Sequence, residues 1–215
     1  MQVLTELYLV RHGQSVANVN NIMAGHSDPE LTELGITQAK ITANAVKDLG
    51  VSAIYSSDLK RAYQTAKETA KIYNLPITTS ENLREMHMGD WEGVSFEEIN
   101  NNYGDEYTKN WKENFGTFRS PNGESVKEVL ERVEKELTLI AKKHKGEKVL
   151  VFVHGGVIRA FFANIMGLFP DRADELPWAT NASYSTAIFD GENFHFKNYS
   201  VDDFIPKDMI SIFKG

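Results

Sequence analysis

Two histidines lie at positions where catalytic residues are often found. His12 lies between Arg11 and Gly13, directly after a short apolar run, and His154 ends a second apolar run and precedes two glycines. A neutral imidazole can act as a nucleophile or a general base, and glycine lets the backbone approach a ligand closely. A single histidine of this kind is more often a structural residue. Two of them at equivalent positions favour a shared active site.

Two arginines and a glutamate extend this pattern. Arg11 is adjacent to His12, and Arg61 opens the helix expected after the second strand. A guanidinium is a planar donor that matches phosphate or carboxylate, and a helix N-terminus also favours an anion. Glu85 precedes a glycine turn and could protonate a leaving group. Taken alone, Arg61 reads as a solvated residue and Glu85 as an exposed loop residue; together with the histidines they predict an oxyanion or phosphoryl pocket.

Three other chemistries are less well supported by the sequence. Gly13, Gln14 and Ser15 resemble a degenerate serine-hydrolase turn, but the asparagine-rich residues that follow do not predict the helix that such a turn opens. The oxyanion loop of that class precedes its serine, whereas His154 and its glycines follow Ser15. The histidines lack metal-binding spacings, and no Gly-x-x-x-x-Gly-Lys phosphate loop is present. A serine nucleophile stays as an alternative, which fluorophosphonate labelling of Ser15 would reveal.

The elements that must position these residues alternate between strands and helices. Continuous apolar runs predict buried strands at residues 7–10 and 149–153, and further strands are expected at residues 51–55 and 77–79. Helical spacing predicts helices after Thr32, after Ser57 or Asp58, after Ser125 and from residue 157 to 166. Such an alternation indicates an α/β fold with a mainly parallel sheet that is covered on both faces. The carboxyl ends of its strands are where ligands bind.

The remaining segments predict an edge and an insertion. Strands at residues 184–189 and 194–199 flank a hairpin turn, which indicates an antiparallel edge. Residues 94–122 are polar and aromatic, and they open with a capping box from Ser95 to Glu98, so we expect a helical insertion or lid. We find no linker and expect one domain over residues 1–215. The tail from residue 202 carries apolar residues that could pack onto the body or a neighbour: Phe204, Ile205, Ile210, Ile212 and Phe213.

Composition and charge limit the class of protein. The 215 residues include no cysteine, which excludes a disulfide scaffold, a cysteine-ligated zinc site and a thiol nucleophile. The net charge of −7 makes nucleic acid an unexpected partner. The first ten residues contain no basic region and no apolar run long enough for a secretion signal or a membrane span. We therefore expect a cytoplasmic protein with no membrane association.

At this point the motifs resemble those of the histidine phosphatase superfamily, the phosphoglycerate mutase-like proteins. Residues 11–18 are similar to the family's Arg-His-Gly-x-Ser-x-x-Asn motif. Four more blocks resemble family motifs in the same order along the chain, at residues 31–35, 56–65, 83–93 and 153–156. Five blocks in the right order are a much more specific pattern than any one of them.

The resemblance implies a three-layer α/β/α sandwich and a phosphohistidine mechanism. In that scheme His12 is the nucleophile, and Glu85 protonates the leaving group and then activates water. Arg11, Arg61 and His154 hold the phosphoryl oxygens and stabilise the charge of the transition state. Because these cations take the role that magnesium plays elsewhere, no metal is required. Further substrate contacts are expected from Asn18, Gly155, Ser15 and Gln14.

The superfamily contains both phosphatases and mutases that depend on 2,3-bisphosphoglycerate. Glycolytic mutases resemble longer chains with an Arg-Arg-x-Tyr-Asp-x-Pro-Pro stretch in the insertion, and this chain lacks both the arginine doublet and the paired prolines. We therefore expect a phosphatase that acts on a small phosphorylated metabolite without a cofactor. The alternative is a mutase using 2,3-bisphosphoglycerate, and a third hypothesis is a non-catalytic phosphate-binding protein. Trp91, Trp111 and Phe115 are candidates to cover the leaving group, and a homodimer is left open.

Overall fold

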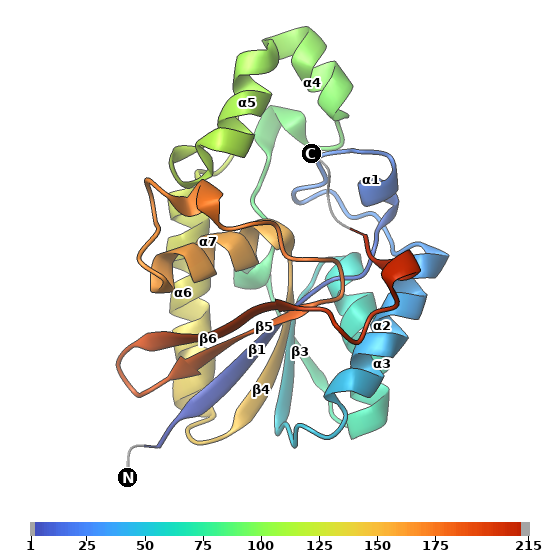
Figure 1. Cartoon of the computed structure of the whole chain (residues 1–215), viewed down its shortest axis with the longest axis vertical. Helices are drawn as coiled ribbons and strands as arrows, with labels where there is room; N and C mark the ends of the chain where they lie inside the picture. The colour runs from blue at the N-terminus through green and yellow to red at the C-terminus, as the bar shows by residue number, and fades with distance from the viewer. Residues whose placement is uncertain (1–2, 212–215) are drawn as a thin grey trace.

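The computed structural model describes residues 3–211, apart from the side chain of Tyr107. Within this range six strands form one open sheet in the order β3-β2-β4-β1-β5-β6 (Figure 1). The strands are β1 Thr5–Arg11, β2 Ala53–Ser57, β3 Ile77–Ser80, β4 Lys148–Val153, β5 Tyr184–Phe189 and β6 Phe194–Val201. Strands β3, β2, β4 and β1 run parallel, whereas β5 and β6 are antiparallel to their neighbours. The predicted parallel sheet with an antiparallel edge is therefore confirmed.

Helices precede or follow most of these strands. The α-helices are α1 Val16–Val19, α2 Glu33–Val46, α3 Lys60–Tyr73, α4 Phe96–Tyr103, α5 Asp105–Glu113, α6 Val126–Lys143 and α7 Gly155–Ile165. Short 3-10 helices occur at Glu81–Leu83, Gly89–Trp91, Phe115–Thr117, Ala173–Glu175 and Lys207–Met209. No helix among the described residues is long and apolar enough to cross a membrane.

The sheet is covered by two helical layers because successive strand residues point to opposite faces. Leu7 and Leu9 of β1 belong to the larger core, with α6 and α7, while Tyr8 and Val10 belong to the smaller core, with α2 and α3. Figure 1 shows α6 and α7 on one side of the sheet and α2 and α3 on the other. The three-layer α/β/α architecture expected from the motifs is confirmed.

Local capping signals set several helix starts. The hydroxyls of Ser95 and Ser125 cap α4 and α6, and Glu98 and Glu128 bond back to the two serines, so both predicted capping boxes are present. Thr32 caps α2 as predicted. Because these capping bonds join residues only three positions apart, they can be predicted from the sequence.

Two helix starts differ from the prediction. Helix α3 begins after Leu59, whose side chain makes no capping bond, and neither Ser57 nor Asp58 is the cap. The Asp58 carboxylate instead pairs with the guanidinium of Arg84, a partner that local sequence does not reveal. Helix α7 begins at Gly155, two residues earlier than expected, because the low helix propensity of two glycines hid its first turn.

Residues 94–122 hold α4, α5 and one 3-10 helix, in agreement with the predicted helical insertion. In Figure 1 this part stands above the carboxyl ends of the parallel strands. Aromatic packing attaches it to the body, with ring centroids 5.3 Å apart for Trp111 and Trp178 and 5.4 Å apart for Trp91 and Phe118. Its movement as a lid stays a prediction. In the predicted apolar tail, Ile205 is buried, whereas Ile212 and Phe213 lie outside the described residues.

Candidate active site

The two predicted histidines meet at the carboxyl ends of adjacent strands. Strands β1 and β4 pair in parallel with Arg11 opposite Val153, so the residues that follow, His12 and His154, emerge at the same edge of the sheet. Their ring centroids are 5.3 Å apart, and both side chains are buried. The expected juxtaposition is therefore present.

The His12 ring is held in one tautomer. Its Nδ1 lies 2.7 Å from the carbonyl oxygen of Gly13. Because a carbonyl only accepts, Nδ1 carries the proton and Nε2 keeps its lone pair. Burial, followed by the charges of Arg61 and Arg11, lowers the pKa of His12 well below the ordinary 6.5. The ring is thus neutral at physiological pH, which is the state a nucleophile needs.

Two buried guanidiniums are fixed by backbone carbonyls rather than by carboxylates. Arg61 donates to Ser27 O at 2.9 Å and to Gly25 O at 2.8 Å, and Arg11 donates to Ala179 O. Burial lowers the pKa of each guanidinium to about 10, so both are charged at neutral pH. Among the described residues, Arg11 Nε has no hydrogen-bond partner. This leaves positive charge and a free donor for an anion.

His154 is completely buried, and neither ring nitrogen has a hydrogen-bond partner within the described part of the chain. Burial, and then the charges of Arg61 and His12, lower its pKa well below 6.5. Buried polar atoms without partners are uncommon in folded proteins and call for a specific explanation. A phosphoryl oxygen between the two rings would provide the missing partner.

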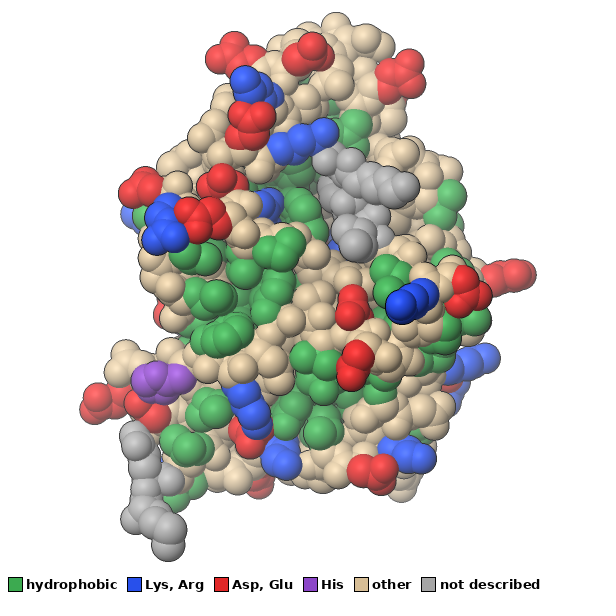
Figure 2. Space-filling view, viewed as in Figure 1, with side chains coloured by type: hydrophobic (Ala, Val, Ile, Leu, Met, Phe, Trp, Pro, Cys, Tyr) green, Lys and Arg blue, Asp and Glu red, His purple; other side chains and the backbone are tan. Residues whose placement is uncertain are grey.

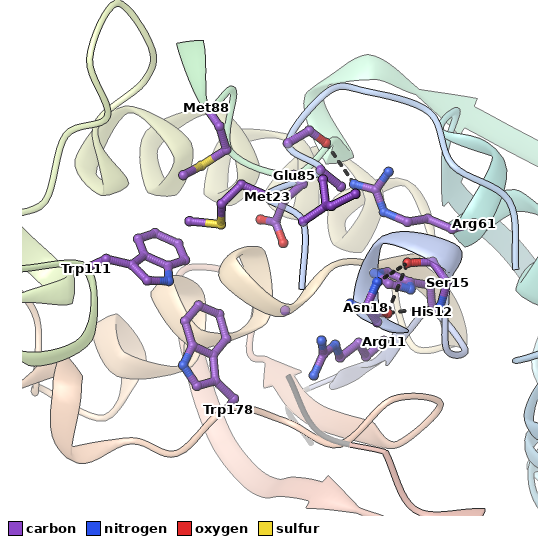
Figure 3. A pocket seen from close by; sticks show the side chains of 14 residues that line it. Arg11, His12, Ser15, Asn18, Met23, Arg61, Glu85, Met88, Trp111 and Trp178 are labelled. Carbon is purple, nitrogen blue, oxygen red and sulfur yellow. Dashed lines mark hydrogen bonds between the residues drawn. The ribbon is translucent and has the colours of Figure 1, made fainter. Parts of the chain in front are cut away.

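Glu85 holds its carboxylate at the N-terminus of α7. One oxygen accepts from Gly156 N at 3.0 Å, and the other accepts from Met86 N at 3.0 Å. A Cβ on Gly156 would lie 2.5 Å from Glu85 Oε1, so only glycine leaves room for this contact. Figure 3 shows the carboxylate pointing into the cavity, toward the side where Arg11, Arg61 and His12 gather.

Ser15 and Asn18 cap each other across α1, a helix that the sequence did not predict. Asn18 Oδ1 accepts from Ser15 N at 3.0 Å, from Ser15 Oγ at 3.1 Å and from Asn181 Nδ2 at 3.3 Å. The Asn18 amide nitrogen therefore lies at the opposite end of the group, as a substrate contact requires. Because the Ser15 hydroxyl donates to Asn18 and not to a histidine, the geometry offers no general base for a serine nucleophile.

Of the two remaining predicted contact residues, Gly155 lies at the pocket and Gln14 does not. Gly155 lines the pocket beside Arg11, and an added Cβ would lie 3.2 Å from Arg11 Nε. Gln14 does not line the pocket, since its Oε1 accepts from the hydroxyl of Thr32 at 2.8 Å. The predicted substrate contact of Gln14 stays a prediction.

Glu92 stabilises the loop around residues 25–27, whose carbonyls bind Arg61. Its Oε1 accepts from the backbone of His26 at 2.7 Å and of Met88 at 2.8 Å, and its Oε2 accepts from Ser27 N at 2.7 Å. Gly25, at φ +46°, leaves space for this carboxylate. Glu92 lies within the motif block at residues 83–93, but the sequence did not predict this role.

Beyond the charged end, the pocket has apolar walls. The empty space, including its open mouth, is about 500 Å³. The apolar lining residues are Ile22, Met23, Ala24, Met88, Trp111 and Trp178. Figure 3 shows Trp111 and Trp178 across the cavity from Arg11 and Arg61. On the face of the molecule that Figure 2 shows, acidic and basic side chains are interspersed.

Only one of the three aromatic candidates lines this pocket. Trp111 does, whereas Trp91 and Phe115 are buried in the core. Trp178, which sequence reasoning missed, packs against Trp111 with centroids 5.3 Å apart and against the Arg159 guanidinium at 4.7 Å. It belongs to an irregular segment without periodicity, so no local signal pointed to it.

The chain is similar to known proteins both in sequence and in fold. The profile of the histidine phosphatase superfamily (branch 1) matches residues 7–202. A metal-independent phosphoserine phosphatase from Arabidopsis thaliana is 36% identical, over 75% of this chain and 69% of that protein. A phosphoglycerate mutase from Schizosaccharomyces pombe is 34% identical, over 81% of this chain and 85% of that protein. The structure of a mycobacterial glucosyl-3-phosphoglycerate phosphatase superposes with a TM-score of 0.83 at 30% identity, covering 93% of this chain and 100% of that one.

Proposed function

The chain belongs to the histidine phosphatase superfamily (branch 1), and from this premise we propose that it hydrolyses small phosphate monoesters without a metal, through a phosphohistidine intermediate. The observation that supports the proposal most is the state of His12. Its Nδ1 is bound to Gly13 O, its pKa is lowered by burial, and two buried arginines carry the positive charge beside it. A neutral nucleophile beside permanent cations suits attack on a phosphate dianion.

In the first step, His12 Nε2 attacks phosphorus, the new P–N bond forms and the ester P–O bond breaks. Arg11, Arg61 and His154 hold the three non-bridging oxygens, with the Asn18 amide as a further donor. Glu85 gives its proton to the departing alcohol oxygen, so the alcohol leaves neutral. The products of this step are the free alcohol, the Glu85 carboxylate and phosphorylated His12.

In the second step, the Glu85 carboxylate takes a proton from water, and the resulting hydroxide attacks phosphorus. The P–N bond breaks, inorganic phosphate forms, and the electron pair returns to Nε2 of His12. Glu85 is protonated again and ready for the next ester. The same carboxyl group thus serves as acid and then as base.

The test is phosphate release from a panel of esters that includes phosphoserine and 3-phosphoglycerate, with and without chelator. We expect turnover that chelator does not affect, and an acid-labile phosphoenzyme that disappears in His12→Ala. His195→Ala is the control, because His195 is 58% exposed and paired with Asp190 on the surface hairpin. Turnover that survives His12→Ala, or that chelator abolishes, would refute the proposal.

A mutase is the second candidate, supported by the relative named phosphoglycerate mutase. A mutase must hold a second phosphate, yet among the described lining residues only Arg11 and Arg61 are cationic. A coupled isomerisation assay with 2,3-bisphosphoglycerate separates the two activities. Interconversion of phosphoglycerates faster than phosphate release would favour the mutase, and ligand binding without any turnover would favour a phosphate-binding protein.

A further inference from the structure

Arg132, which does not line the pocket, makes contact with the backbone that carries Glu85. From α6 its Nη1 donates to Asn82 O at 2.9 Å and to Arg84 O at 2.8 Å, and its Nη2 donates to Glu85 O at 2.8 Å. The segment between Leu83 and Gly89 has no regular secondary structure of its own. Arg132 therefore supplies hydrogen bonds that a helix or strand would otherwise provide.

Glu124 completes this arrangement. Its Oε1 accepts from Arg132 Nε at 2.8 Å and its Oε2 from Arg132 Nη2 at 2.9 Å, so all five N–H groups of the guanidinium have acceptors. The same Oε2 accepts from His87 N at 2.8 Å, and Glu124 N donates to His87 O at 2.9 Å. Burial alone would raise the pKa of Glu124, but the bonds from Arg132 and His87 lower it, so it is ionised at neutral pH.

The loop is also held by a second segment, the turn that contains His26. His26 Nε2 lies 2.9 Å from Glu85 O, and because a carbonyl only accepts, His26 donates there. Glu85 O thus receives two side-chain donors, from His26 and Arg132, while the Glu85 carboxylate accepts from Gly156 N. The Glu85 backbone is therefore fixed by His26 and Arg132, and the Glu85 carboxylate is fixed by Gly156 N.

From this geometry we propose that Arg132, paired with Glu124, is a positioning residue that sets Glu85 against the leaving-group oxygen. The inference rests on the proposed phosphatase function. Proton transfer needs donor and acceptor within hydrogen-bond reach, and a displacement of about 1 Å can reduce a rate roughly 100-fold. A lysine in place of Arg132 would keep the charge but could not satisfy three carbonyls and a carboxylate at once.

The experiment uses the dependence of the rate on the leaving group. An alkyl phosphate requires protonation of a poor leaving group, whereas 4-nitrophenyl phosphate leaves as a stable anion. We expect Arg132→Lys to lower kcat/KM for the alkyl ester by about 100-fold, and for 4-nitrophenyl phosphate by less than about 5-fold. In a Glu85→Gln background, Arg132→Lys should add little further loss for the alkyl ester, because both changes act through one carboxyl group.

Arg172→Lys is the matched control, because Arg172 makes an equally bidentate pair with Glu175 on the surface. It should leave both esters unaffected. If Arg132→Lys does not fold, Glu124→Gln, which weakens the same pair, must show the same preference for the aryl ester. An equal loss for both esters, or additive losses with Glu85→Gln, would overturn the role of Arg132. Turnover that survives His12→Ala would instead overturn the proposed function, so the two failures are distinguishable.

Discussion

The reactivity of His12 depends on where its proton is held and on what surrounds the ring. A carbonyl fixes the proton on Nδ1, and burial together with two arginines disfavours a second proton. His154 is subject to the same burial. Both imidazoles therefore stay neutral in the folded protein, and this lowers the free energy of unfolding at acidic pH.

This predicts how stability changes with pH. Below about pH 6.5 the unfolded chain protonates both histidines, whereas the folded chain does not until their lowered pKa values are reached. The unfolded state then binds more protons, so the free energy of unfolding falls as pH decreases, by up to about 1.4 kcal/mol per pH unit for each proton. Urea denaturation from pH 7.5 to 5 should show a shallower decline for His12→Asn than for the wild type. Parallel curves would contradict the lowered pKa of His12.

A second prediction concerns the shape of the Arg61 side chain. Its two terminal nitrogens bond to Gly25 and Ser27, which orients the fork toward the pocket. Arg61→Lys keeps the charge but loses that orientation, so kcat/KM should fall by roughly 100- to 1000-fold. Lys60→Ala, one residue earlier and exposed in its pair with Glu30, should have no effect on phosphate release. Near-wild-type activity of Arg61→Lys would show that charge alone suffices.

At the level of elements, the site depends on which segments meet. The adjacent parallel strands β1 and β4 bring the histidines together, and the N-terminus of α7 receives Glu85. The insertion adds Trp111 from α5, which packs on Trp178 from the segment before β5. In the proposed mechanism, the reacting groups and the aromatic wall of the pocket thus come from different parts of the chain.

This division predicts an effect of the insertion on substrate affinity. Trp111→Leu removes one aromatic wall, worth about 0.5–1.5 kcal/mol, so KM for aryl phosphates should rise about 2- to 10-fold with little change in kcat. Phe118→Leu is the control, because Phe118 packs against Trp111 at 5.1 Å but does not line the pocket. It should lower the melting temperature and leave KM unchanged. A similar KM for both variants and the wild type would exclude Trp111 from substrate binding.

At the scale of the whole molecule, a net charge of −7 coexists with a pocket whose charged end holds two buried arginines. The acidic and basic side chains on the face in Figure 2 do not gather by sign. The three layers bury the pocket's cations away from the acidic surface, and little of their charge is neutralised by direct ion pairs.

An anion in the pocket should therefore stabilise the entire fold. Inorganic phosphate would give partners to Arg11 Nε and to the His154 ring, and at 100 times its Kd it would add about 2.7 kcal/mol to the free energy of unfolding. Thermal unfolding with phosphate, against chloride at equal ionic strength, measures this. The shift should be smaller in Arg61→Lys. Equal melting temperatures in the two salts would argue against an anion site.

Sequence reasoning was most successful where the signal is local or periodic. The caps at Ser95 and Ser125 act over three residues, and apolar runs mark β1 and β4 at the centre of the sheet. It was less successful at α1, where the capping pair Ser15 and Asn18 was overlooked, at the start of α7, which two glycines obscured, and for Trp178, whose contact with Trp111 joins distant residues. The motif around His12 predicted the family, which the comparisons confirm.

The sequence by itself therefore determined the order of elements, the layered α/β architecture and the residue types of the site. Only the tertiary structure decided the burial of His12 near Arg61, the place of Trp178 in the pocket wall and the contacts of Arg132 with the Glu85 backbone. The physical reason is distance along the chain. Arg132 and Glu85 are 47 residues apart, and Arg11 and Ala179 are 168 apart, so their contacts arise only when the layers pack.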